Sequence, residues 1–290
     1  PLYHFAVVVD DADAGVTHII RGEDILSSTP RQILIQEALG FVRPAYIHLP
    51  LILSKDRKKL SKRNDVVSLG DYRKQGFIPE GIMNYLALLG WNPGTERELF
   101  TLDELIQEFS LEKLQKSGAV FDDTKLKWFN HEHLKKLSDK EFLKRLTEYM
   151  NVGPLPRYTP DIVPLLKERS QTLGEAAQAL EAGEYTFMEE TVTYPLDLLT
   201  QGAKTDFATA KKNLETVAEL LTKVTDTRFT AEEVKEVVFP YASEQGRASV
   251  LWPMRVALSG KGKSPDPFTL AGLLGKEKTL ERIEKAAKML

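Results

Sequence analysis

The sequence has 290 residues, 42% hydrophobic and 28% charged, with a formal net charge of -3, which excludes a fibrous or wholly disordered chain and predicts two or three globular units. No cysteine is present and the five histidines are scattered, which excludes disulfides and thiolate-bound metals, so we expect no structural metal. No apolar run could span a membrane and no signal peptide is present, so we expect a cytoplasmic protein. The length allows each unit to bury its own core, so we also expect a monomer.

Three apolar stretches near the start predict β-strands. Residues 3–11 contain the run FAVVV, which is typical of a strand buried on both faces, and residues 16–21 predict a second strand. Residues 46–53 predict a third. Because the sequence opens at Pro1, directly before the first of these runs, we expect it to be part of a longer protein.

A helix is predicted between the second and third of these strands. Residues 24–29 supply capping side chains, and Pro30 suits the first turn of a helix that we expect to reach Leu39 and stop at Gly40. The predicted order is β-β-α-β, so the first 68 residues belong to the α/β class.

From residue 69 the apolar spacing becomes helical. One such stripe consists of Ile82, Tyr85, Leu86 and Leu89 and ends at a break at 90–94. The spacing continues at 102–109 and 124–137. We therefore expect a helical unit at 69–137.

Amphipathic helices dominate everything after Ser138. Loops are predicted at 153–160, 194–195 and 260–267, and no run of short alternating strands occurs. We expect an all-helical region at 138–290, with a division near 184–195 if it has two parts.

Basic residues are concentrated in one loop despite the negative net charge. Residues 55–63, KDRKKLSKR, hold six basic side chains and one acid, whereas 96–112 and 175–190 are acid-rich. A basic run alone is usually a solvated patch. Because phosphate binding depends on local Lys and Arg, a polyanion site at this loop remains open.

Several stretches resemble one family in its own order along the chain. The basic loop with its continuation at 57–91 resembles the lysine-serine-lysine loop of class I aminoacyl-tRNA synthetases, and specifically the bacterial-type glutamyl-tRNA synthetases. The stretches at 3–11, 15–40, 48–63 and 249–268 resemble the same family. No His-Ile-Gly-His-type element occurs, so the resemblance begins in the second half of the nucleotide-binding domain.

The resemblance implies a multi-domain architecture and a reaction. Residues 1–68 would be the C-terminal part of a Rossmann-type catalytic domain, 69–137 a stem-contact domain and 138–290 an anticodon-binding region. The parent enzyme would activate glutamate with ATP and Mg²⁺ and transfer it to tRNA-Glu. The chain alone is expected to bind tRNA without activating glutamate.

The basic loop would act on the phosphates of ATP. Charge builds on the phosphate oxygens during activation, and a preorganised ammonium group stabilises it. Catalytic roles are implied for Lys59, Ser61 and Lys62. The residues implied to bind ATP are Asp24, Lys59, Leu60, Ser61, Lys62 and Arg63.

The glutamate substrate would meet the chain at Tyr3, Val7 and Arg21. Arg21 follows an apolar strand, and its guanidinium can hold a carboxylate through two parallel hydrogen bonds. The alternative for Arg21 is a surface ion pair with Glu23 or Asp24. Val7 stands where some relatives carry an amide, which weakens a polar role at that position.

The tRNA contacts are implied along the helical part. Lys125 and Trp128, three residues apart on one helix face, would meet the tRNA arm, and Arg169 would read the third anticodon base. Further anticodon contacts are implied at Arg255, Ser264, Pro265 and Phe268. Phe268 could stack on a base or be an ordinary core phenylalanine.

Two other kinds of protein remain as alternatives. One is a free-standing tRNA-binding module, which would need neither the basic loop nor Arg21. The other is a helical scaffold that does not bind RNA, and retention of tRNA with a steep salt dependence would exclude it.

Overall fold

The computed structural model describes residues 2–57, 68–151, 155–189, 191–203 and 205–290. The chain divides into two compact units. Unit 1 consists of Pro1–Met150 and Lys167–Ala176, and unit 2 of Asn151–Leu166 and Ala177–Leu290. No helix in the described part of the chain is long and apolar enough to cross a bilayer.

Unit 1 begins with a small α/β segment. Its elements are α1 (Tyr3–Asp13), β1 (His18–Gly22), the 3-10 helix η1 (Glu23–Ser28), α2 (Thr29–Leu39) and β2 (Ala45–Leu49). The two strands are parallel, with His18 opposite Ala45 and Gly22 opposite Leu49. As predicted, α2 ends at Gly40, whose φ of 68° is a left-handed conformation that glycine adopts without strain.

The strand predicted at 3–11 is wrong, because these residues form α1. A continuous apolar run can be a buried helix or a buried strand, and its periodicity does not decide between them. Here the segment packs along α2, where His4 Nδ1 lies 3.4 Å from Gln32 Nε2. Packing against a helix therefore outweighs the β preference of the three valines.

The strand predicted at 46–53 is interrupted. β2 ends at Leu49, before Pro50, which has no N–H to donate to a ladder. Pairing resumes at Leu53, whose N–H donates to Ala119 O at 2.9 Å and whose carbonyl accepts from Phe121 N at 2.8 Å. The sheet among the described residues thus has two strands instead of three.

The middle of unit 1 is helical, as predicted. It contains α3 (Leu69–Lys74), α4 (Pro79–Gly90), α5 (Leu102–Glu108), the 3-10 helix η2 (Leu111–Lys113) and α6 (Asp123–Lys136). A core of Phe77, Ile82, Tyr85, Leu126 and Phe129 joins α4 to α6. Leu86 is 44% exposed, so the stripe predicted on α4 is narrower than four residues.

The helix α7 (Asp139–Met150) completes the first part of unit 1, and α8 (Thr159–Arg169) and α9 (Leu173–Glu181) follow. The Gly76 loop packs tightly on residues 173–174, since Leu173 N donates to Gly76 O at 2.9 Å. A Cβ on Gly76 would lie 2.1 Å from Gly174 N. Only glycine fits at this contact.

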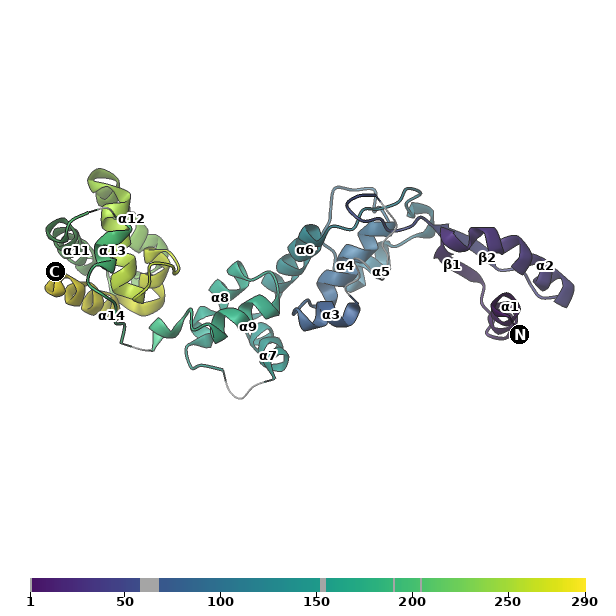
Figure 1. Ribbon diagram of the computed structural model, residues 1–290, viewed down its shortest axis with the longest axis horizontal. Helices are drawn as coiled ribbons and strands as arrows, with labels where there is room; N and C mark the ends of the chain where they lie inside the picture. The colour runs from purple at the N-terminus through teal and green to yellow at the C-terminus, as the bar shows by residue number, and fades with distance from the viewer. Residues whose placement is uncertain (1, 58–67, 152–154, 190, 204) are drawn as a thin grey trace. The chain divides into compact units, whose positions relative to one another are not determined.

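Unit 2 ends in a helical bundle. It contains the 3-10 helix η3 (Thr186–Met188), α10 (Leu198–Gln201), α11 (Phe207–Thr222), the 3-10 helix η4 (Asp226–Arg228), α12 (Ala231–Gln245), α13 (Arg247–Ser259) and α14 (Pro267–Met289). The last helix packs against α11, α12 and α13 (Figure 1). Of the residues described after Ser138, none forms a strand, which confirms the all-helical prediction.

Candidate functional site

Arg21 lies at the carboxyl end of β1, as predicted. Its Nη2 donates to Thr29 Oγ1 at 2.7 Å and its Nε donates to His48 Nε2 at 3.3 Å. The guanidinium also lies 5.1 Å from the centre of the Tyr46 ring. Among the described residues, these contacts use two of the five N–H donors of Arg21, and the other three could receive a carboxylate.

The side chain of Arg21 is held by Thr29 and His48. Glu23, one of the two acids in the alternative ion pair, accepts from Leu51 N at 3.3 Å through its Oε1. Because β1 and β2 are parallel and in register at Arg21 and His48, the sheet itself brings the arginine to its histidine partner. The arginine is therefore positioned by the fold.

Tyr3 and Val7 lie one helical turn apart on α1, so they share a face of a helix and not of a strand. Tyr3 is 58% exposed, and its ring meets that of His4 edge-on. No hydrogen bond or ring contact among the described residues joins Tyr3 to Arg21. The structure thus presents Tyr3 and Arg21 on separate elements.

Of the residues implied to bind ATP, the structure describes Asp24 alone. Asp24 is an exposed residue in the first turn of η1, directly after β1. Lys59, Leu60, Ser61, Lys62 and Arg63 lie outside the described residues. Within the described ranges, no group of three or more His, Asp or Glu side chains gathers as a metal site would require.

The predicted arm contacts lie on α6. Trp128 is 37% exposed and packs edge-on against Phe129, so part of the indole is open to solvent. Lys125 Nζ lies 2.5 Å from Glu98 Oε1 in an exposed ion pair. Exposed pairs of this kind contribute only about 0–1 kcal/mol, so a phosphate could replace Glu98 at small cost.

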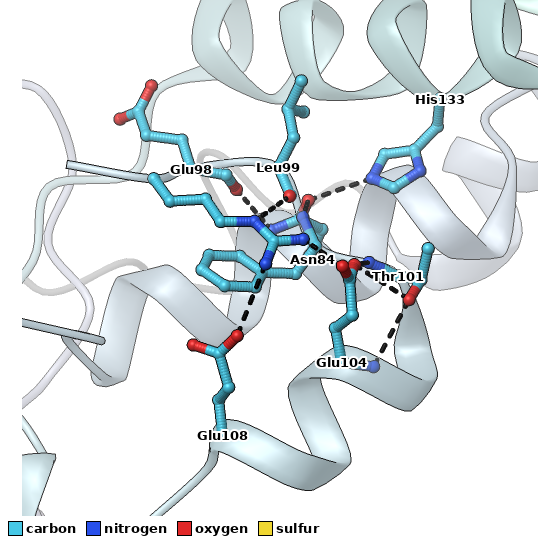
Figure 2. A network of polar contacts seen from close by, with 9 residues as sticks. Asn84, Glu98, Leu99, Thr101, Glu104, Glu108 and His133 are labelled. Atoms are coloured by element: carbon cyan, nitrogen blue, oxygen red, sulfur yellow. Dashed lines mark hydrogen bonds and ion pairs between the residues drawn. The ribbon is translucent and has the colours of Figure 1, made fainter. Parts of the chain in front are cut away.

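A buried polar network joins α4 to α6 (Figure 2). Asn84 Nδ2 donates to Glu98 O at 2.9 Å, and Asn84 Oδ1 accepts from Phe100 N at 2.9 Å. His133 Nε2 donates to the same oxygen at 2.9 Å. Burial, together with nearby Lys136, lowers the pKa of His133, which favours this neutral donor form.

The network continues into a charged cluster at the start of α5 (Figure 2). Arg97 Nε donates to Leu99 O at 3.0 Å, and its Nη atoms pair with Glu104 and Glu108. Hydrogen bonds from the Thr101 backbone and from Arg97 lower the pKa of Glu104 to about 2. The cluster holds the loop that presents Glu98 to Lys125.

Two buried amides and one buried histidine were not predicted from the sequence. Asn84 and Asn130 are fully buried, and His133 is 5% exposed. Their signal was present, since each is a polar residue in the apolar stripe of a predicted helix. A polar side chain in such a stripe needs a partner, and the partner is what sequence alone does not reveal.

Arg169 is the last residue of α8 and is exposed. Ser170, which follows it, is 4% exposed. Arg169, which is predicted to read the third anticodon base, is therefore an exposed residue at the end of a helix, directly before a buried one.

The remaining tRNA predictions cluster on α13 and the start of α14. Arg255 is half-buried, and its Nε is a buried donor without a partner among the described residues. Ser264 Oγ lies 3.1 Å from Ser259 Oγ and donates to Pro265 O at 3.2 Å. The loop between the helices is thus held by its own hydroxyl groups.

Phe268 is 8% exposed and meets Phe239 edge-on, as the alternative of a core phenylalanine expects. Its ring also borders a pocket of 450 Å³, whose lining includes Lys235 and Thr269. Its proposed role in stacking on a base stays a prediction.

Comparison with known proteins places this geometry in a family. Residues 1–128 match the family model described as tRNA synthetases class I (E and Q), catalytic domain, and residues 104–287 match the model described as anticodon binding domain. The glutamate–tRNA ligase of Clostridium botulinum (strain Eklund 17B) is 39% identical over 295 residues. That of Heliobacterium modesticaldum is 39% identical over 302 residues. Both alignments cover 100% of the chain, and they cover 60% and 59% of the two relatives.

Solved structures give the same result. The glutamate tRNA ligase of Elizabethkingia meningosepticum, in complex with its amino acid, matches with a TM-score of 0.74 and 31% identity, covering 100% of this chain and 60% of that one. The glutamate-tRNA synthetase of Elizabethkingia anophelis matches with a TM-score of 0.70 and 30% identity, covering 99% and 60%. The chain thus spans about 60% of the length of these relatives. On the agreement of the two family models, the chain belongs to the class I tRNA synthetases that carry this anticodon binding domain, and along its whole length it is similar to glutamate–tRNA ligases.

Proposed function

We propose that the chain is part of a glutamate–tRNA ligase, in which it supplies the tRNA-binding body and part of the site that activates glutamate with ATP. The observation that carries this proposal is the anticodon-binding match over 104–287, in a chain that aligns along its whole length with glutamate–tRNA ligases. The all-helical character of the described residues after Ser138 supports the same role.

Within that ligase, Arg21 would bind the carboxylate of glutamate. Its hydrogen bonds to Thr29 and His48 hold the guanidinium before substrate arrives, so little side-chain entropy is lost on binding. Tyr3 and Val7 would border the same substrate from α1. This role fits an arginine whose guanidinium is held by a hydroxyl group and an imidazole ring.

On the ATP side, Asp24 and the loop of Lys59, Leu60, Ser61, Lys62 and Arg63 would meet the nucleotide. Lysine ammonium groups there would stabilise the charge that develops on the phosphates. The reaction would use ATP with Mg²⁺.

The tRNA body would contact tRNA-Glu at two places. Lys125 and Trp128 would meet the arm, and Arg169, with Arg255, Ser264, Pro265 and Phe268, would meet the anticodon. Two structural features support these contacts: the exposed part of Trp128, and the Nε of Arg255, which has no hydrogen-bond partner among the described residues.

The test is to run glutamate-dependent pyrophosphate exchange and filter binding of tRNA-Glu on one preparation of the chain. Groups from both halves of a nucleotide fold must be positioned for the chemistry, and positioning supplies about 7–11 kcal/mol of barrier reduction. We therefore expect no detectable exchange, and tRNA binding that weakens steeply with salt. Absence of binding at low salt would overturn the proposal, and robust exchange would show that the chain holds a complete activation site.

A further inference from the structure

The chain directly after Arg169 is held by two consecutive residues of α6. His131 Nδ1 donates to Ser170 O at 3.0 Å, and Asn130 Nδ2 donates to Gln171 O at 2.6 Å. Residues 167–176 belong to the same compact unit as α6, so these bonds lie inside one body. The two carbonyl groups that follow Arg169 are therefore both fixed to one helix.

Asn130 is itself locked in place. Its side chain is fully buried, and its Oδ1 accepts from Ile78 N at 2.7 Å while its amide donates to Gln171. The backbone of α4 closes the space on another side, because a Cβ on Gly81 would lie 2.7 Å from Asn130 Cα. Rotation of the side chain would leave the buried N–H of Ile78 without its acceptor and would release the carbonyl of Gln171.

A second connection holds the same segment from α6. Lys127 Nζ pairs with Glu175 Oε1 at 3.1 Å, and Glu175 Oε2 accepts from Gln171 N at 2.7 Å. Gln171 is thus bound at its N–H by Glu175 and at its C=O by Asn130. The peptide units beside Arg169 have little freedom to turn.

The helix that makes these bonds also carries the proposed arm contacts, Lys125 and Trp128. We infer that Asn130 and His131 are positioning residues, which fix Arg169 relative to Lys125 and Trp128 so that discrimination at the third anticodon base depends on them. The inference rests on the proposed function. The new element is that one helix, α6, positions both the residues that contact the tRNA arm and the arginine that contacts the anticodon base.

The chain offers a matched control on the same helix. His133 is also bonded through a ring nitrogen, but its partner is Asn84 on α4 at 2.9 Å, as Figure 2 shows. Loss of either histidine ring removes one hydrogen bond of α6. Only the loss of His131 frees the segment that follows Arg169.

The experiment measures filter-binding Kd values of the full chain for two tRNAs. One is tRNA-Glu, and the other is the same tRNA with G in place of C at the third anticodon position. A base contact corresponds to roughly 5- to 150-fold discrimination, so the wild type should prefer C by about 10-fold or more, and Arg169→Gln should abolish most of that preference. Wild type without a preference would overturn the proposed base reading, and the inference with it.

With discrimination established, the histidine variants decide the inference. His131→Ala should shrink the ratio at least threefold, by about the amount that a displaced contact loses, whereas His131→Gln, which keeps an N–H donor, should retain most of it. His133→Ala should lower the melting temperature and leave the ratio unchanged. An unchanged ratio in His131→Ala, or an equal loss in His133→Ala, would overturn the inference. Should His131→Ala not fold, Glu175→Ala tests the same inference, because Glu175 pairs with Lys127 and accepts from Gln171 N. This variant should also shrink the ratio of the two Kd values, and an unchanged ratio would overturn the inference.

Discussion

The α/β segment at 2–49 and the helical segment at 69–137 differ in what they bury. In the first, Val8 is the one large hydrophobic side chain that is buried among the described residues, while Leu34 is 65% and Val42 is 92% exposed. In the second, aromatic residues such as Phe100 and Phe129 are fully buried. Apolar patterning therefore predicts secondary structure well in a segment whose apolar side chains pack into their own core. It predicts secondary structure poorly in a segment whose apolar side chains are largely exposed among the described residues.

The close contact at Gly76 gives the largest expected effect in the helical segment. Gly76→Ala would place a Cβ 2.1 Å from Gly174 N at a φ of +81°, which combines overpacking with backbone strain. We expect a loss of about 4 kcal/mol in the free energy of unfolding, measured by urea denaturation.

Gly94 is the matched control, because its φ is +83° and a Cβ there would meet nothing within 4 Å. Gly94→Ala isolates the backbone strain and should cost about 1–2 kcal/mol. Equal losses in the two variants would show that the packing of the Gly76 loop on residues 173–174 is not stabilising.

The contrast in burial predicts the next effect. Leu126 is 1% exposed in the helical core, so Leu126→Ala should lower the free energy of unfolding by about 3 kcal/mol. Leu34 is 65% exposed on α2, so Leu34→Ala should lower the free energy of unfolding by less than about 0.5 kcal/mol. Comparable losses in the two variants, by chemical denaturation, would contradict the described difference between the segments.

A smaller effect depends on pH and concerns Glu104. Its pKa is lowered from 4.5 to about 2 in the folded chain, chiefly by the Thr101 backbone and by Arg97. A carboxyl group with a depressed folded-state pKa stabilises the protein above its unfolded pKa and loses that contribution as pH falls toward the folded value. Stability should therefore decline between about pH 4.5 and 2.

Glu104→Gln tests this contribution, because the amide cannot titrate. The variant should be less stable than the wild type at pH 7, and the difference should shrink as the pH falls through this window. Parallel curves for the two proteins, from thermal melts across the range, would rule out Glu104 as a source of the acid sensitivity.

The helices of the middle segment were largely readable from sequence. The predicted helices at 102–109 and 124–137 correspond to α5 and α6, because Thr101 and Asp122 cap them and their apolar stripes face a local core. Residues 3–11 were misassigned, since FAVVV fits a strand or a helix and only the neighbouring α2 decides. Local signals suffice when the deciding contacts are local.

The candidate site shows the same limit. The place of Arg21 at a strand end was predicted, but its bond to His48 depends on the register of two strands far apart in sequence, and its bond to Thr29 depends on how α2 packs beside β1. The hydrogen bonds from Asn130 and His131 to the carbonyl groups of Gln171 and Ser170 join segments about forty residues apart in sequence. No periodicity in either segment indicates these bonds. Such partners become visible only in the folded chain.

The central claim, that the helical body is the part that binds tRNA, has a direct test. The full chain is cross-linked to tRNA-Glu with ultraviolet light, and the linked peptides are identified by mass spectrometry. We expect cross-links at Trp128 on α6 and in the stretch from Arg255 to Phe268. Cross-links confined to residues 2–49, or none at a salt concentration where binding is measured, would contradict it.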